Sequence, residues 1–169
     1  MILKQKIFHF QKKIFKFVIL TVNFLFLNVE QTYSRNFIDK GYYVIDLKNR
    51  VEWLKCSVGQ VWENDDCIGD PVKLTLNDAK DLTDQVGIEL GGEWRLPDKK
   101  ELMSLICKNC EKVKIDESVF PDTPAEIFWT SQRNWWSPKF FWSVNFFTGY
   151  TYGRFVPEKK LFVRFLRDR

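Results

Sequence analysis

Histidine is nearly missing from the sequence, since His9 is the only one among 169 residues. Residues 35–169 contain none. This excludes Ser-His-Asp and Cys-His catalysis from that part of the chain, together with zinc and copper sites that use histidine ligands. Carboxylates, lysines and cysteines are the groups left for catalysis. We assign none of them a catalytic role, and we expect no metal site and no cofactor.

An excess of positive charge is also missing from most of the chain. The formal net charge is +4, from 26 Lys and Arg against 22 Asp and Glu. Residues 1–34 hold five lysines and one acid and so account for the whole excess, while residues 35–169 balance at zero. The overall basic footprint of a nucleic-acid-binding protein is therefore absent, and no nucleic-acid partner is expected.

No apolar run reaches the length of an unaided membrane span, which is about 18 residues or more. The longest uncharged and mostly apolar run, Phe17 to Val29, has 13 residues. Lysines precede it and the small residues Thr32 and Ser34 follow it, which is typical of a secretory signal peptide over residues 1–34. We expect cleavage after Ser34, with an N-terminal membrane anchor as the main alternative and a buried core helix as the third. Either leading case predicts an extracytoplasmic location: periplasm, cell surface or secreted.

Cysteine is sparse, with four residues: Cys56, Cys67, Cys107 and Cys110. An even number in an oxidising compartment predicts disulfides, with three possible connectivities. Pairing in sequence order is favoured because it closes two short loops, and a four-cysteine zinc site is disfavoured because the first pair is too widely spaced. The Cys107-Lys-Asn-Cys110 motif follows a predicted helix, where the dipole disfavours a thiolate. A structural disulfide is therefore preferred there, with a thiol-disulfide protein as the alternative.

No repeat or long linker interrupts residues 40–169, which predicts one domain. Two short helices are expected: residues 76–86, capped by Thr75 and stopped by Gly87, and residues 99–106, capped by Asp98 with Glu101 reaching back. Residues 59–70 are expected to form a loop. Strands are expected over residues 42–46, 50–56, 127–131, 140–147, 150–155 and 161–167, with Thr148-Gly149 as a tight turn. The pattern predicts an α+β fold, with two short helices packed on antiparallel sheet and long loops.

Six blocks carry a resemblance to a known family. They are EWLKCSVGQVW (residues 52–62), GEWRLPDKKELMSLI (92–106), FPDTP (120–124), FWTS (128–131), FWSVNFFTG (141–149) and VRFLR (163–167). Their order and spacing resemble the Lcl C-terminal domain family, a bacterial extracytoplasmic domain of unknown function. The resemblance covers roughly residues 42–169. It implies a C-type-lectin-like fold and, from the best-known member, an adhesin that binds sulfated glycosaminoglycans; it does not imply an enzyme.

Departures from lectins and from that adhesin limit what the resemblance implies. The Glu-Pro-Asn and Gln-Pro-Asp tripeptides of calcium-dependent lectins do not occur, and there is no collagen-like Gly-X-Y stalk. A lectin-like fold therefore does not by itself imply lectin activity. We interpret Arg95 as a buried structural arginine paired with a carboxylate. The bulky motif residues are interpreted as core: Trp94, Leu96, Leu102, Phe120, Trp129, Trp142 and Val144.

Two features mark a candidate ligand site. The segment Gln132 to Lys139 is predicted to be a surface loop that carries a pair of tryptophans between two cations, an arrangement that suits sugar rings or protein partners. Residues 133–169 carry a net charge of +6, which leaves −6 for residues 35–132. A locally basic face could hold sulfated or acidic polysaccharide. The candidate ligand-binding residues are Arg133, Trp135, Trp136, Lys139, Arg154, Lys159 and Lys160.

The preferred hypothesis is an exported, non-enzymatic binding module that recognises an anionic glycan or a surface protein, in keeping with a role in adhesion. A structural envelope component and a thiol-disulfide protein that uses the Cys107/Cys110 pair are the alternatives. A relative of the formylglycine-generating enzymes is disfavoured because those enzymes use a cysteine pair late in the domain, and no cysteine follows Cys110. The membrane is expected as a partner only through the N-terminal segment, if that segment is retained.

Overall fold

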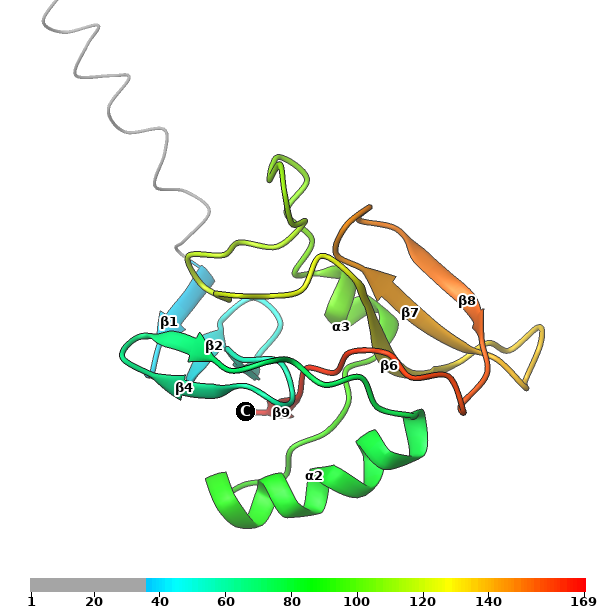
Figure 1. The fold of residues 1–169 in the computed structure, drawn as a ribbon, viewed down its shortest axis with the longest axis horizontal. Helices are drawn as coiled ribbons and strands as arrows, with labels where there is room; N and C mark the ends of the chain where they lie inside the picture. The colour runs from blue at the N-terminus through cyan, green and yellow to red at the C-terminus, as the bar shows by residue number, and fades with distance from the viewer. Residues whose placement is uncertain (1–35) are drawn as a thin grey trace, which may run out of the picture. The chain divides into compact units, whose positions relative to one another are not determined.

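A computed structural model describes residues 36–169, which contain two helices and nine short strands (Figure 1). The elements are β1 (Phe37–Asp39), β2 (Tyr43–Asp46), β3 (Val51–Leu54), β4 (Val61–Glu63), β5 (Asp66–Ile68), α2 (Leu76–Leu90), α3 (Lys99–Met103), β6 (Ile127–Arg133), β7 (Phe141–Asn145), β8 (Thr151–Phe155) and β9 (Leu166–Asp168). Antiparallel sheets with two helices confirm the α+β class. The predicted signal peptide lies outside the described residues. Within residues 36–169, no helix combines the length and the apolar character needed to cross a bilayer.

The first sheet joins the two ends of the described chain. Its order is β1-β2-β3-β9, and every neighbouring pair is antiparallel. The predicted hairpin of β2 and β3 is confirmed, but β1 was not expected. Trp53 on β3 pairs with Leu166 on β9, so the last strand returns to the first hairpin.

The second sheet, β6-β7-β8, is formed by the aromatic C-terminal runs, as predicted. The turn between β7 and β8 is tight, because the Gly149 amide donates to the Asn145 carbonyl at 2.8 Å and Gly149 has a φ of 77°. The strand predicted over residues 161–167 is mostly wrong. Residues 161–165 are buried and connect by isolated bridges, such as Phe128 with Phe162, and only the end of this run joins a sheet.

Both helices begin where predicted but end elsewhere. Thr75 caps α2 and accepts from the Asp78 amide, and Asp98 with Glu101 forms a full capping box on α3. The stop predicted at Gly87 is wrong, because α2 continues to Leu90 and ends at Gly91, whose φ of 70° leaves the helical region. The second helix stops at Met103, because the amides of the following residues donate to carbonyls three positions back, whereas α-helical amides donate four positions back.

A hairpin occupies the segment that was predicted to be a loop. Strands β4 and β5 pair Trp62 with Cys67, and the turn between them uses Asn64 and Asp65, both with positive φ (51° and 62°). Asn and Asp tolerate this conformation better than other side chains. The predicted bridge Cys56–Cys67 is confirmed and fastens this hairpin to the end of β3.

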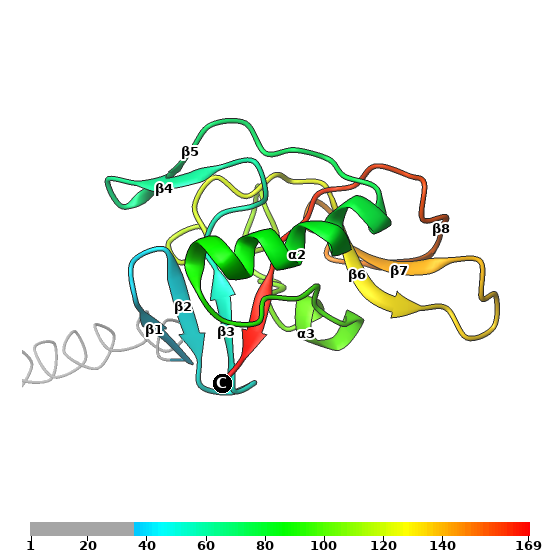
Figure 2. The same cartoon turned by 90° about the horizontal axis from the view of Figure 1, so that it is seen from below.

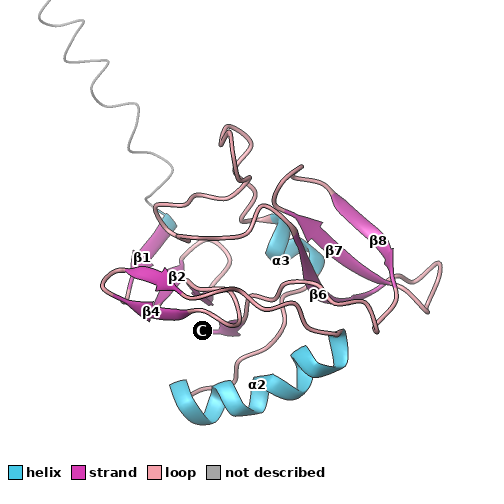
Figure 3. Cartoon of the chain, in the orientation of Figure 1, coloured by secondary structure: helices cyan, strands magenta, loops and turns pink. Residues whose placement is uncertain are grey.

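Two buried clusters form the core. One packs Trp53, Phe120 and Phe128 between the sheets, and the other packs Trp94 and Trp129 under α2. In Figure 2, α2 runs across the view in front of the sheets, and Figure 3 shows how much of the intervening chain is loop. The predicted core residues are buried, apart from Trp142, which is half-buried.

Candidate functional site

One end of the second sheet gathers every residue predicted to bind a ligand. Strand β6 ends, β7 begins and β8 ends there, because Phe141 pairs with Arg133 on one side and with Phe155 on the other. The loops 134–140 and 156–160 therefore leave the sheet from the same end, on the right in Figure 1. We call the five cations there, Arg133, Lys139, Arg154, Lys159 and Lys160, the basic end, and Trp135 with Trp136 the tryptophan pair.

The cations of the basic end are exposed and unneutralised. Within residues 36–169, none of the five has a carboxylate oxygen within 4.0 Å, although Glu158 lies in one of the two loops. Aromatic rings lie against three of them instead, namely Arg133, Lys139 and Arg154. The guanidinium of Arg133 lies 5.2 Å from the Phe141 ring, and the ammonium of Lys139 lies 5.0 Å from the Phe140 ring. Such contacts orient a cation without cancelling its charge.

The tryptophan pair projects into solvent. Trp135 and Trp136 are 69% and 74% exposed, and their rings stack with centroids 3.6 Å apart. Neither ring folds back onto the domain. Two such indoles form a broad apolar surface of the kind that marks an interaction site.

Asn134 anchors the loop that carries the pair, a role that the sequence analysis missed. Its backbone amide donates to the Phe140 carbonyl and its side-chain amide donates to the Gly153 carbonyl, both at 2.8 Å. Its side-chain oxygen accepts from the Trp136 amide at 3.1 Å. The boundary predicted for this loop is also corrected, since Gln132 and Arg133 belong to β6.

Trp142 forms a platform next to this loop. A Cβ atom on Gly153 would lie 3.0 Å from the Trp142 ring, so the glycine lets the ring pack flat on β8. On Trp142, the ammonium of Lys99 lies 4.0 Å from the ring centroid. Lys99 is a sixth cation near the basic end that the sequence analysis did not single out, because only the fold brings α3 beside β6 and β7.

The other cations of the C-terminal region do not join the basic end. Arg167 pairs with Glu52 at 2.6 Å, and its guanidinium lies 4.6 Å from the Trp94 ring. Arg169 follows β9 in the other sheet, where its amide donates to Arg50. The charge of +6 counted along residues 133–169 is therefore divided between two sheets and the core.

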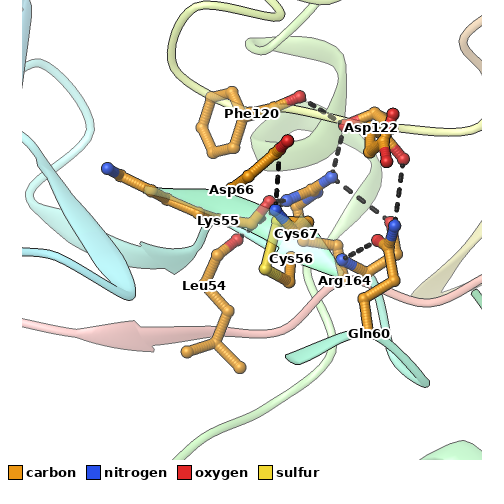
Figure 4. Close-up of a disulfide and its surroundings, with 11 residues drawn as sticks. Leu54, Lys55, Cys56, Gln60, Asp66, Cys67, Phe120, Asp122 and Arg164 are labelled. Carbon is orange, nitrogen blue, oxygen red and sulfur yellow. Dashed lines mark hydrogen bonds between the residues drawn. A yellow bond between two sulfur atoms is a disulfide. The ribbon is translucent and has the colours of Figure 1, made fainter. Parts of the chain in front are cut away.

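Arg164 is fully buried and serves the structure (Figure 4). Its guanidinium donates to the carbonyls of Leu54 and Lys55, and to the hydroxyl of Thr123 at 2.6 Å. Burial without a carboxylate lowers the pKa of Arg164 to about 9, so the group is still a cation at neutral pH. The contacts tie the FPDTP block to the segment that holds Cys56.

Arg95 is paired with carboxylates, as predicted, but it is not buried. It donates to Glu101 at 2.7 Å and to Asp168 at 2.5 Å, and its side chain is 37% exposed. These bonds raise the pKa of Arg95 and lower the pKa of Asp168. Arg95 and Asp168 border an open polar cavity of about 690 Å³ that Asp84, Glu93 and Arg167 also line.

A second, more apolar hollow is lined by none of the residues of the basic end. This groove has a volume of about 500 Å³ and lies between the C-terminal half of α2 and the segment from β3 to β4. Leu82, Val86, Val58 and Trp62 line it, with Phe165 among its inner residues. No motif predicted it, because its two walls are distant in sequence.

The Cys107–Cys110 bridge is formed, which confirms the predicted connectivity. Cys107 is buried, and the Lys114 ammonium donates to the Cys110 carbonyl. Within residues 36–169, no group of three or more His, Cys, Asp or Glu side chains is arranged to hold a metal ion.

Comparison with known proteins gives one match. The family model of the Lcl C-terminal domain matches residues 42–167, which is most of the chain. No curated protein and no solved structure matches the sequence.

Proposed function

The chain belongs to the Lcl C-terminal domain family, and from that premise we propose that it is an exported binding module that recognises an anionic glycan at the basic end. The observation that carries the proposal is the gathering of five exposed cations, none with a carboxylate partner in residues 36–169, beside an exposed, stacked tryptophan pair. Sulfate and carboxylate groups suit the cations, and the faces of sugar rings suit the indoles.

The location and the lectin-like fold are part of the same proposal. Two disulfides favour an oxidising compartment outside the cytoplasm, where such bonds persist. The antiparallel sheets, the two helices, the long loops and the return of β9 onto β3 favour a C-type-lectin-like fold. A rigid scaffold of this kind holds variable loops at one end, and here those loops carry the cations.

Retention on immobilised heparin tests the proposal. The protein, purified with its disulfides intact from an exporting host, is expected to bind at low salt and to elute as screening increases. The variant Arg133→Gln/Lys139→Gln/Lys159→Gln is expected to elute at clearly lower salt. A matched control, Lys48→Gln/Lys108→Gln/Lys112→Gln, removes the same charge from exposed sites elsewhere and is expected to elute close to the unchanged protein.

Equal elution of the two triple variants would remove the basic end as the site. A glycan array then separates sulfated from carboxylated ligands. Binding to no glycan, with capture of a surface protein that the same triple variant abolishes, would favour the protein partner instead.

A further inference from the structure

Acidic residues border the apolar groove at the other extremity of the molecule. Glu89 lines the groove, Glu63 follows the lining residue Trp62 on β4, and the Asp70 carbonyl lies against Gly59. We call Glu63, Asp70 and Glu89 the acidic rim. All are exposed, and within residues 36–169 none has a basic group within 4.0 Å. Residues 59–70 contain no lysine or arginine. The Lys55 ammonium lies 4.1 Å from the Trp62 ring centroid, but it is paired with Asp39, so the acidic rim keeps its negative charge.

The groove also leaves apolar surface uncovered. Val61 is 67% exposed and pairs across the hairpin with Ile68, which is 49% exposed. Leu90, at the end of α2, is exposed as well. The volume of about 500 Å³ lies within the range of sites that hold a small ligand or an aromatic anchor. An apolar hollow with a polar rim is the usual form of a protein interaction site.

The complement of this surface is present on the same molecule. The tryptophan pair is an exposed aromatic projection, and the basic end places beside it cations that have no carboxylate partner among the described residues. Figures 1 and 2 both place the β6–β7 loop and the β4–β5 hairpin at opposite ends of the view, so one copy cannot fill its own groove. We propose that a second copy of this chain docks its tryptophan pair into the apolar groove, with the basic end of one copy against the acidic rim of the next.

Such a contact is head-to-tail. Each copy has one tryptophan pair and one apolar groove, so copies add one after another into a chain unless a ring closes. Burial of the indoles supplies the attraction, and the opposite charges select the register and speed the encounter. This inference does not rest on the proposed function, but the two share the basic end. An anionic glycan that occupies those cations is therefore expected to release the second copy.

Sedimentation velocity over a concentration series tests the proposal. The exported protein at low salt is expected to sediment faster as its concentration rises, and to return to the monomer at high salt. Trp135→Ser/Trp136→Ser is expected to weaken association by about tenfold or more, because these residues form the buried anchor. An unchanged protein that stays monomeric throughout the series would overturn the proposal.

A charge swap gives the sharper result. Arg133→Glu/Lys139→Glu/Lys159→Glu/Lys160→Glu reverses the charge of the basic end, because only Arg154 of its five cations remains, and Glu63→Lys/Glu89→Lys reverses the charge of the acidic rim, where only Asp70 remains. Each variant alone is expected to lose association, because like charges then face each other, and an equimolar mixture is expected to recover it. The matched control Glu111→Lys/Glu117→Lys has the net charge of the rim variant but leaves the groove intact.

The outcomes separate the two proposals. A rim variant that associates like the unchanged protein, a mixture that does not recover, or a control that loses association equally would overturn head-to-tail docking. The rim variant keeps the basic end and is expected to keep heparin retention. Loss of retention in the triple glutamine variant, with normal retention in the rim variant, therefore tests glycan binding independently. All the exchanged residues are exposed, and unchanged thermal unfolding verifies that each variant is folded.

Discussion

The guanidinium of Arg164 donates a hydrogen bond of 2.6 Å to the hydroxyl of Thr123, and both residues are buried. The bond spans 41 residues of sequence. It joins the FPDTP block to the run VRFLR, two of the blocks that carry the family resemblance. A buried cation without a carboxylate depends on such neutral acceptors, because each lost acceptor leaves a donor unpaired.

Thr123→Val is therefore expected to destabilise the protein by about 1–3 kcal/mol, since it removes the acceptor and keeps the shape. Thr123→Ser keeps the hydroxyl and serves as the control. Urea unfolding followed by circular dichroism measures both. A midpoint for Thr123→Val equal to that of Thr123→Ser would show that this hydrogen bond contributes little.

Gly153→Ala is expected to disturb the platform under the tryptophan loop. The added Cβ would lie 3.0 Å from both the Trp142 ring and the Asn134 side chain, so both must shift by a few tenths of an ångström. Overpacking of this kind costs about 1–3 kcal/mol. A double-mutant cycle with Trp142→Leu is expected to recover part of the loss. Strict additivity of the two changes would place the cost elsewhere.

Patterns within a few residues of sequence correctly predicted where the two helices begin. Thr75 and Asp98 cap helices through hydrogen bonds to residues three positions on, and these caps were predicted correctly. The pairing of β3 with β9 joins residues that are more than a hundred positions apart, and no local pattern fixes such a pairing. The β4–β5 hairpin was missed because its strands have three residues each, too short for an alternating pattern.

The candidate site was predictable in composition but not in arrangement. The sequence identified Arg133, Lys139 and Lys159 as cations near a tryptophan pair, and the strand directions bring them to one end. The predicted site included Arg154, which is exposed, and left out Arg164, which is buried, but the charge of +6 counted along residues 133–169 included both. Burial of a charged side chain depends on acceptors from distant segments, and these become known only with the tertiary structure.

Asp168 predicts a small acid dependence of stability. Its hydrogen bond from Arg95 lowers the pKa of Asp168 below its ordinary value of 3.8. A carboxylate whose pKa is lower in the folded state stabilises the fold above the unfolded value, and this contribution is lost as pH falls through the folded pKa. Because the Asp168 side chain is 75% exposed, less than about 1 kcal/mol is expected at neutral pH.

Asp168→Asn removes this carboxylate. The difference in the free energy of unfolding between the variant and the unchanged protein is expected to be present at pH 6 and to diminish as the pH falls below 3.8 and through the lowered pKa of Asp168. Urea titrations at a series of pH values measure it. A difference that persists undiminished at the acidic end would assign the effect to packing rather than to ionisation.

The Cys107–Cys110 bridge is expected to act as a structural staple. It closes a shorter loop than Cys56–Cys67, so the loop-entropy model assigns it about 2 kcal/mol against about 3 kcal/mol for the longer loop. Cys107→Ser/Cys110→Ser is therefore expected to lower stability modestly and to leave heparin retention unchanged, because the bridge belongs to neither loop of the basic end. Thiol titration of the exported protein is expected to find no free cysteine. Reduction of this bridge alone by a mild dithiol, with turnover of a disulfide substrate that the double variant lacks, would instead favour the thiol-disulfide alternative.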